Sequence, residues 1–264
     1  MRFGRAKYSF PRKVFTMEQI YRETFLLKST DCDRFGRLKP SVLLSLMQEV
    51  ASEQCRDTEV SWDALAQKGL FFAISRTHVR INRLPGARER ITLETWPGKT
   101  SRVAYPRHTV AYDASGNELF RAVSLWVLMD VNSRAMVIPG KSGVNFDGWE
   151  FGGELPVPTS IAPKELALNT ERTVAFSELD VNGHMNNTHC ADWAQDLLPS
   201  AYHADHPLQD FTVCYLSEAR EGDRIRVCYE LSNEGALVVN SLLTDETPAG
   251  NKERRVFAIR ANYL

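Results

Sequence analysis

Cysteine is scarce in this sequence and is never arranged for metal binding. The chain has 264 residues and five cysteines, which are scattered and never spaced as paired metal ligands. This pattern argues against a zinc site and against a disulfide framework, and it predicts reduced thiols in a cytoplasmic protein. We expect neither a metal nor a cofactor. The five residues are Cys32, Cys55, Cys190, Cys214 and Cys228.

Long apolar runs and an excess of either charge are also missing. No run of about 18 apolar residues occurs, and the basic segment 1–7 is not followed by an apolar stretch, so we expect neither a secretory signal nor a membrane span. The 32 Lys and Arg residues nearly balance the 33 Asp and Glu residues, leaving a formal charge of −1. Such a balance gives no overall attraction to nucleic acid or to an anionic membrane. The length fits one large domain or two small ones.

Polar, chemically versatile residues are instead concentrated between residues 178 and 187, which read ELDVNGHMNN. Asp180, Asn182 and His184 alternate, so in an extended or gently curved backbone their side chains would project to one side. Gly183 permits a backbone conformation barred to other residues, and the asparagines that follow can cap a helix. The alternative is an Asn/Gly-rich turn whose polar side chains only satisfy backbone groups. The spacing alone leaves a polar site and a structural turn both open.

The two halves of the chain resemble each other at low identity. Residues 24–38 align with residues 171–185, so that Asp33 falls on Asp180 and Gly36 on Gly183, an offset of 183 − 36 = 147. In a second register, at an offset of 134, residues 90–91 fall on residues 224–225 and residues 116–117 fall on residues 250–251. The two offsets differ by 147 − 134 = 13 residues. The helix and loop between these segments must therefore be 13 residues shorter in the second half.

The order of patterns repeats as well. An apolar stripe that follows a proline predicts a helix over residues 40–54, and a shorter stripe predicts another over residues 190–197. Alternation predicts strands after each helix, at residues 76–81, 91–95, 107–112, 119–129, 211–216, 224–231, 236–243 and 255–263. A Pro/Gly-rich connector without period lies between the halves. The sequence thus predicts an α+β fold of two curved antiparallel sheets, each wrapped around a central helix and joined edge to edge.

In these motifs the chain resembles acyl-acyl carrier protein (ACP) thioesterases, enzymes with two tandem hotdog domains that release fatty acids from their carrier. The most specific parts are DVNGHMNN from Asp180, which runs into Trp193 and Pro199, and LWVLMD from Leu125, followed by Arg134. The resemblance covers residues 25–264. It implies an N-terminal hotdog domain over 1–138 with the acyl-chain pocket, a linker over 139–169, and a C-terminal hotdog domain over 170–264 with the catalytic residues.

The resemblance also implies the active-site residues. The family's Asp, Asn and His match Asp180, Asn182 and His184, and its glutamate in the second domain matches Glu218. Plant members carry a cysteine directly after that glutamate, whereas this chain has an alanine, so a thiolate mechanism at that position is excluded. Cys214 has the strand parity of Glu218 and is the alternative nucleophile, although nothing in the sequence predicts a lowered pKa for it.

Thioester hydrolysis needs a nucleophile, a base and donors for the oxyanion. With water as the nucleophile, Glu218 is the candidate base, and Asn182 and His184 position the water or polarise the carbonyl. Asp180 would orient Asn182 or fix the histidine tautomer. Which donor meets the oxyanion stays open. No Gly-x-Ser-x-Gly motif occurs, so a serine-hydrolase route lacks its landmark. We expect hydrolysis of fatty acyl-ACP, which releases free fatty acid and terminates fatty acid synthesis.

By resemblance, the acyl chain lies between the helix and the sheet of the first half. The expected lining residues are Leu43, Met47, Val50, Phe71, Phe72, Trp96 and Trp126. Because carrier proteins are acidic, a basic surface should dock them. The first half concentrates basic residues on expected exposed strand faces and turns, namely Arg76, Arg80, Arg83, Arg88, Arg90, Lys99, Arg102 and Arg107.

Two other functions remain open at this point. One is an acyl-CoA thioesterase, since single-hotdog enzymes of that kind share the Asp-x-Asn-x-His theme. The other is a non-catalytic hotdog module that binds acyl groups without cleaving them. One tandem chain is equivalent to a hotdog dimer, so both a monomer and a homodimer are compatible with the sequence.

Overall fold

The computed structural model describes residues 20–144, 146, 148–149, 155–247 and 250–263. The basic segment 1–7 and part of the connector lie outside these residues. No helix in the described part of the chain is both long and apolar enough to cross a membrane.

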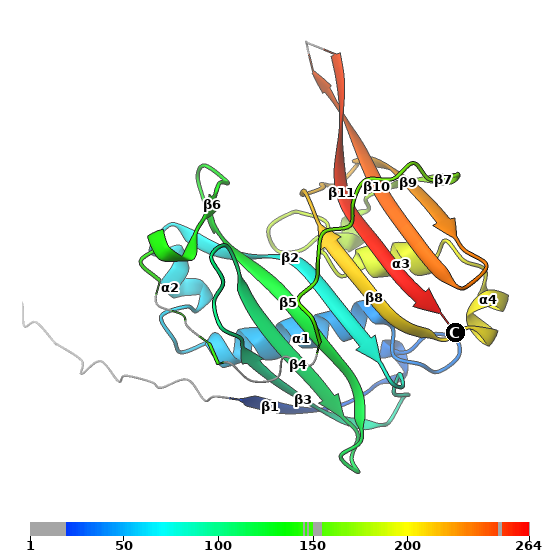
Figure 1. The fold of residues 1–264 in the computed structure, drawn as a ribbon, viewed down its shortest axis with the longest axis horizontal. Coiled ribbons are helices and arrows are strands. Elements are labelled where there is room, and N and C mark those ends of the chain that lie inside the picture. The colour runs from blue at the N-terminus through cyan, green and yellow to red at the C-terminus, as the bar shows by residue number, and fades with distance from the viewer. Residues whose placement is uncertain (1–19, 145, 147, 150–154, 248–249, 264) are drawn as a thin grey trace, which may run out of the picture.

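Each half contributes five main strands and a central helix, as expected (Figure 1). The first half consists of β1 (Tyr21–Leu26), α1 (Pro40–Cys55), α2 (Trp62–Ala66), β2 (Leu70–Ile81), β3 (Arg90–Pro97), β4 (Tyr105–Tyr112) and β5 (Glu118–Asp130). The second half consists of β7 (Leu168–Thr173), α3 (His189–Gln195), α4 (Ser200–Asp205), β8 (Leu208–Tyr215), β9 (Arg224–Leu231), β10 (Ala236–Thr247) and β11 (Gly250–Tyr263). A short β6 (Met136–Val137) pairs with β5, and single 3₁₀ turns lie at Ser29–Asp31, Pro139–Lys141 and Phe176–Glu178.

One antiparallel sheet runs through the molecule in the order β1-β3-β4-β5-β2-β8-β11-β10-β9-β7. Each main strand of the first half has a counterpart in the second, and the counterparts follow in the same order from either edge of the sheet: β1 and β7 lie at the edges, and β2 and β8 meet in the middle. The halves join where β2 pairs with β8, with His78 opposite Thr212. A hydrogen bond between His78 Nε2 and Asp210 Oδ2, at 2.7 Å, lies on this seam. The expected edge-to-edge junction of two antiparallel sheets is confirmed.

The helix α1 forms because Pro40 occupies its first turn and an apolar stripe follows. Leu43, Leu44 and Val50 are at most 1% exposed, and they pack against the sheet in the main core. Burying side chains of this size contributes about 1.5–3 kcal/mol each. The helix extends one residue beyond the predicted end, to Cys55.

The opposite face of the sheet is covered at the seam by the connector (Figure 1). Ile161 packs there against Cys214 and Ala258. Two arginines hold the connector's backbone, since Arg76 donates to the carbonyl of Pro158 and Arg255 Nη1 donates to that of Ile161 at 3.0 Å. The connector therefore lies on the outer face, whereas α1 and α3 lie on the inner one. Its sequence-based boundaries, 139–169, stay a prediction.

Candidate active site

The motif after the Phe176–Glu178 turn folds as a tight turn. The backbone N–H of Asp180 donates to the carbonyl of His184 at 2.8 Å, and Gly183 adopts a φ of +74°. Asp180 Oδ1 accepts the backbone N–H groups of Asn182, at 2.8 Å, and of His184, at 3.1 Å. The motif thus forms the turn that Gly183 permits, because the Asp180 carboxylate accepts these backbone N–H groups.

The carboxylate of Asp180 accepts hydrogen bonds only from groups of this turn among the contacts described. Its Oδ2 accepts the side-chain amide of Asn182 at 3.4 Å, while its other contacts are to backbone N–H groups. Of the two roles considered for Asp180, the geometry supports orienting Asn182. Asn182 is exposed at the tip of the turn, and the side chain of His184 is only 16% exposed beneath it.

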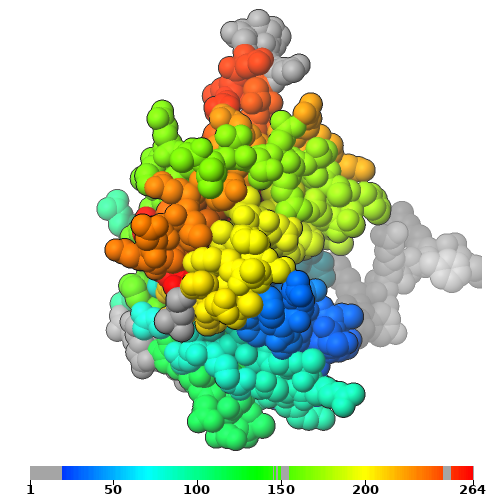
Figure 2. All heavy atoms as spheres, turned by 90° about the vertical axis from the view of Figure 1, so that its right-hand side faces the viewer, coloured from blue at the N-terminus to red at the C-terminus, as the bar shows by residue number. Residues whose placement is uncertain are grey.

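The first half contains the same turn without the same chemistry. Asp33 N–H donates to the carbonyl of Arg37 at 2.7 Å, and Asp33 Oδ1 accepts the N–H groups of Phe35 and Arg37. At the offset of 147, Phe35 stands where the second half has Asn182, and Arg37 stands where it has His184. Arg37 instead lies over the Phe35 ring and donates to the carbonyl of His203. Figure 2 shows the corresponding contact between the yellow α4 region and the blue segment that contains Arg37.

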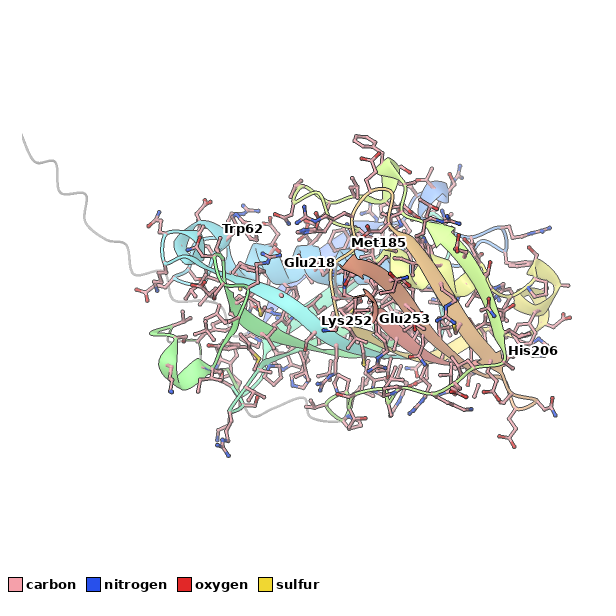
Figure 3. All side chains as sticks on the ribbon, turned by 90° about the horizontal axis from the view of Figure 1, so that it is seen from above. Trp62, Met185, His206, Glu218, Lys252 and Glu253 are labelled. Atoms are coloured by element: carbon pink, nitrogen blue, oxygen red, sulfur yellow. The ribbon has the colours of Figure 1, made fainter. Side chains whose placement is uncertain are left out.

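The loop after β8 brings Glu218 to His184. The backbone N–H of Met185 donates to the carbonyl of Ala219 at 2.8 Å, which fastens this loop to the motif. As a result, His184 Nε2 lies 3.3 Å from Glu218 Oε2. Figure 3 shows Glu218 and Met185 near the middle of the molecule, far from Trp62 at one end and His206 at the other. Two of the four expected catalytic side chains therefore make direct contact across 34 residues of sequence, from 184 to 218.

Two arginines hold Glu218 in place. Arg134 forms an ion pair with its carboxylate, and Arg254 Nη1 donates to its backbone carbonyl at 2.7 Å. Arg134 belongs to the first half, in the turn after β5, where it has a φ of +55° and its guanidinium lies 4.9 Å from the centre of the Phe71 ring. The site is therefore assembled from both halves. The sequence pointed to Arg134 through its motif but gave it no role, because nothing local indicates that it reaches Glu218.

Electrostatics keep the histidine of this site neutral. Burial lowers the pKa of His184, and the positive charges of Arg220 and Arg134 lower it further, whereas Asp180 opposes them. At neutral pH the ring is then uncharged, so it offers one N–H donor and one acceptor nitrogen.

Cys214 is not placed for catalysis. Its side chain is fully buried on the outer face of the sheet, where it packs against Ile161 and lies 3.8 Å from the carbonyl of Thr159. The position after Glu218 is Ala219, which is 2% exposed. The alternative of a cysteine nucleophile at either position receives no support from this geometry.

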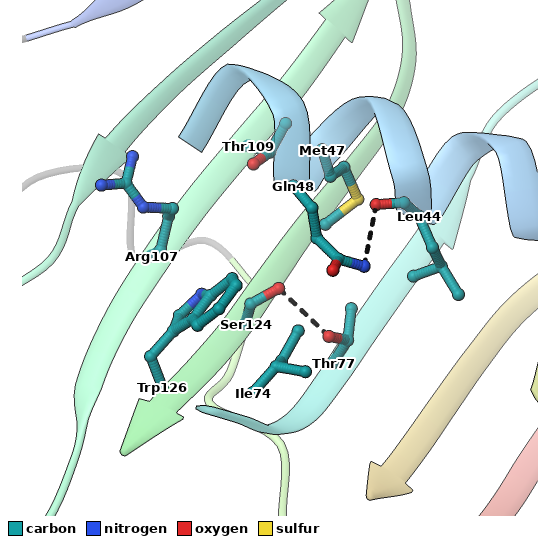
Figure 4. Close-up of a pocket in the computed structure, with 9 residues that line it drawn as sticks. All are labelled: Leu44, Met47, Gln48, Ile74, Thr77, Arg107, Thr109, Ser124 and Trp126. Carbon is teal, nitrogen blue, oxygen red and sulfur yellow. Dashed lines mark hydrogen bonds between the residues drawn. The ribbon is translucent and has the colours of Figure 1, made fainter. Parts of the chain in front are cut away.

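A pocket lies beneath α1, on the inner face of the first half (Figure 4). Its lining comprises Leu44, Met47 and Gln48 from the helix and Ile74, Thr77, Arg107, Thr109, Ser124 and Trp126 from the sheet. Gln48 Nε2 donates to Asn187 Oδ1 at 3.0 Å, so a lining residue is bonded directly to the motif that carries His184. The pocket is thus linked to the motif through Gln48 and Asn187.

Two of the expected lining residues, Met47 and Trp126, line this pocket. The others lie elsewhere: Leu43 and Val50 in the main core, Trp96 stacked on His108 with ring centroids 5.6 Å apart, Phe72 against Tyr105, and Phe71 under Arg134. The polar members Thr77, Thr109, Ser124 and Arg107 were missed, because sequence alternation alone does not say which polar residues turn inward.

The expected basic surface needs correction at two positions, Arg76 and Arg107. Arg76 is half-buried and donates to the connector carbonyl of Pro158. Arg107 is 6% exposed and lies inside, where it donates to Gln54 Oε1 at 2.6 Å and to Thr95 Oγ1 at 3.2 Å. It points inward because β4 places it beside Ser124 of β5, on the face that packs against α1. Arg80 and Arg88 are exposed as expected, and Arg83 pairs with Glu89. Carrier docking on this surface stays a prediction.

Comparison with known proteins places this site in a family context. The N-terminal domain model of acyl-ACP thioesterases matches residues 18–138, and the C-terminal domain model matches residues 161–258. Oleoyl-acyl carrier protein thioesterase 2 of Arabidopsis thaliana is 24% identical over 251 residues, which cover 86% of this chain and 64% of the relative. Dodecanoyl-[acyl-carrier-protein] hydrolase of Umbellularia californica is 24% identical over 243 residues, covering 85% and 63%. This chain therefore spans less than two thirds of these plant relatives.

Solved structures show the same fold. An acyl-ACP thioesterase from Bacteroides thetaiotaomicron superposes with a TM-score of 0.84 at 20% identity, covering 93% of this chain and 98% of the other. The 12:0-ACP thioesterase from Umbellularia californica superposes with a TM-score of 0.75 at 19% identity, covering 93% and 97%. At these identities the likeness concerns the fold, and it confirms the expected pair of tandem hotdog units.

Proposed function

Because the chain belongs to the acyl-ACP thioesterase family, we propose that it hydrolyses the thioester of fatty acyl-ACP and releases the free fatty acid, which terminates fatty acid synthesis. The observation that carries this proposal is the contact between His184 Nε2 and Glu218 Oε2, at 3.3 Å, beside the pocket under α1. A base and a neutral hydrogen-bonding ring are what hydrolysis of a thioester requires.

In the proposed reaction the Glu218 carboxylate takes a proton from water, and the water oxygen attacks the thioester carbonyl. His184 holds Glu218 and the water in line. The side-chain amide of Asn182, which Asp180 orients, donates to the carbonyl oxygen as negative charge develops there. The carbon–sulfur bond then breaks, and the departing thiolate takes the proton that Glu218 had accepted. The acyl chain lies in the pocket under α1.

The choice between ACP and coenzyme A as the thiol carrier can be measured directly. We expect kcat/KM for an acyl-ACP to exceed that for the acyl-CoA of the same chain by at least about ten-fold, because a docked carrier protein adds favourable charge contacts that coenzyme A lacks. Free acid released from both substrates is the quantity to compare. Equal or faster cleavage of acyl-CoA would favour the acyl-CoA thioesterase, and retention of the acyl group without turnover would favour the binding module.

The pH dependence should report on His184. A protonated ring would pair with Glu218 and make its carboxylate a weaker base, so activity should fall as the pH drops through the pKa of His184. Arg220 lowers that pKa. The variant Arg220→Gln should therefore raise it and move the acidic limb of the kcat/KM profile to higher pH.

Arg224→Gln is the matched control for this prediction. Arg224 is an exposed arginine of the same segment, paired with Glu171 rather than facing His184. Its replacement should leave the acidic limb where it is. An unchanged limb in Arg220→Gln, or an equal shift in both variants, would show that the limb does not report the ionisation of His184.

A further inference from the structure

A second pocket occupies the equivalent place in the second half, under α3, and it allows a comparison within one molecule. Its lining comprises Pro40, Ala191, Ala194, Gln195, Leu208, Phe211, Ile259, Ala261 and Tyr263. Strand pairing shows which lining residues of the two pockets correspond. Thr77 lies opposite Ser124 in the first half, and Phe211 lies opposite Ala261 in the second. On the helices Gln195 corresponds to Gln48, since 195 − 48 = 147, the offset that relates the two motifs.

The two pockets differ in polarity at matched positions. Thr77 and Ser124, whose hydroxyls are 3.1 Å apart, are replaced in the second half by Phe211 and Ala261. Thr109, which pairs with Ala122, corresponds to Val239, which pairs with Ile259. The fold therefore does not require polar side chains at these places. The hydroxyls are a property of the first pocket, the one beside the catalytic pair.

Trp126 gives the most specific signal in this set. Its counterpart is Tyr263, whose hydroxyl accepts a hydrogen bond from Gln195 Nε2 at 2.8 Å. The indole Nε1 of Trp126 is buried, yet it has no hydrogen-bond partner among the residues that the structure describes. Gln48 does not serve it, because the side-chain oxygen of Gln48 accepts a hydrogen bond from Asn187 Nδ2 at 3.3 Å instead. An indole N–H can only donate, and buried donors are almost always paired.

Two neighbours add to this polar environment. The hydroxyl of Tyr215 is buried and likewise without a partner of normal geometry among the described residues, although it lies near Thr77. Arg107, whose side chain also lines the pocket, carries a buried positive charge that is bonded to the neutral groups of Gln54, Thr95 and Cys55. A buried guanidinium of this kind favours an electron-rich oxygen nearby.

We propose that this pocket selects acyl chains that carry an oxygen substituent, a hydroxyl or an oxo group, over unsubstituted chains of the same length. The substituent oxygen accepts the N–H of Trp126 and lies against the hydroxyl pair of Thr77 and Ser124 (Figure 4). This specificity rests on the proposed thioesterase function, whose acyl chain would occupy the pocket. An unsubstituted chain would leave the indole donor unpaired, and sites built to bond a polar group discriminate strongly against ligands that lack it.

The test compares acyl-ACP substrates of one chain length that are unsubstituted, hydroxylated or oxo-substituted, with the oxygen at C3 or at the terminal carbon. We expect kcat/KM for at least one oxygenated substrate to exceed that for the unsubstituted one by about ten-fold or more. Trp126→Phe keeps an aromatic ring but removes the donor, and Thr77→Val keeps the shape but removes a hydroxyl. Both variants should lower this ratio, with Trp126→Phe bringing it close to one.

Thr24→Val is the matched control, because Thr24 also forms a hydroxyl pair, with Thr92 at 2.8 Å, but on an exposed part of the sheet. In Thr24→Val, the ratio of kcat/KM for the oxygenated substrate to kcat/KM for the unsubstituted one should equal the wild-type ratio. Thermal unfolding should verify that each variant is folded. Binding of the matching free acids, followed by tryptophan fluorescence, provides a readout that does not need turnover.

The outcomes separate the two proposals. Hydrolysis of unsubstituted chains at an equal or higher rate, or a ratio that survives in Trp126→Phe, would overturn the oxygen preference and leave the thioesterase function standing. Absence of hydrolysis on every acyl-ACP would reject the thioesterase function, and the fluorescence binding would then decide the preference alone, for or against.

Discussion

Replacing Glu218 by glutamine is expected to reduce acyl-ACP hydrolysis by at least about a hundred-fold, equivalent to about 2.7 kcal/mol of transition-state stabilisation. Glutamine has the same shape, so the hydrogen bonds around the loop persist, but it cannot take a proton from water. This prediction for Glu218 rests on its 3.3 Å contact with His184 Nε2 and on the hydrogen bond that fastens Ala219 to Met185. The loss should appear in kcat with purified acyl-ACP.

Glu221→Gln is the control for this variant, since Glu221 is an exposed carboxylate in the same loop. It should retain the wild-type rate. Full activity in Glu218→Gln, with thermal unfolding unchanged, would remove Glu218 from the mechanism and require another base.

The second large effect concerns the support of the catalytic turn. Trp193→Ala is expected to lower the free energy of unfolding by about 3–5 kcal/mol, because Trp193 is among the largest fully buried side chains. Its Nε1 donates to Glu178 Oε1 at 2.6 Å, directly before the motif, and Arg172 lies 4.8 Å above its ring. The change removes packing and also leaves Glu178 Oε1 without the indole donor, while Glu178 Oε2 keeps its bond from the Ala175 N–H. Denaturant unfolding measures the difference.

Trp62→Ala provides the matched comparison, because Trp62 is 61% exposed on α2, at the far end of the molecule (Figure 3). A surface substitution of this kind should change the free energy of unfolding by no more than about 0.5 kcal/mol. Similar losses in both variants would contradict the view that Trp193 anchors the second half. Trp193→Phe should give an intermediate loss, since it preserves a ring but not the hydrogen bond.

The proposed catalytic side chains lie on the motif of the second half and the loop after β8, and the equivalent places of the first half carry different residues. The first-half turn has Phe35 and Arg37 at the positions of Asn182 and His184, and Leu84 corresponds to Glu218, since 218 − 134 = 84. Around that place α4 lies against the turn, with the carbonyl of His203 bonded to Arg37. The two halves have thus kept one backbone plan while their side chains diverged.

Much of the fold could be predicted because its signals are local. The helix at residues 40–54 and the strand at residues 224–231 were found from apolar periodicity, and the structure has them at Pro40–Cys55 and Arg224–Leu231. Burial of one face requires such periods whatever the partner is. The repeat could be recognised from the sequence for a related reason: Gly36 and Gly183 both adopt positive φ in the same turn.

Predictions of the face on which a side chain lies were less accurate. Arg107 was expected on the surface but faces inward, because one step along a strand reverses the face on which a side chain lies. The spacing of the motif left open whether it forms a turn, and the structure shows a turn around Asp180. The assignment of catalytic roles and the domain boundaries at residues 138 and 170 stay predictions.

The sequence by itself determined the two-unit plan, the helices and strands within each unit, and the motif that holds Asp180, Asn182 and His184, because periodicity and turn chemistry are properties of neighbouring residues. Only the tertiary structure decided that Glu218 contacts both His184 and Arg134. It also decided that the first pocket is lined by Thr77, Ser124 and an indole N–H without a partner among the described residues, whereas the second pocket has Phe211, Ala261 and the hydrogen-bonded Tyr263 at these places. These arrangements depend on strand register and on the seam between β2 and β8. Contacts between residues far apart in the chain leave no periodic signal in it.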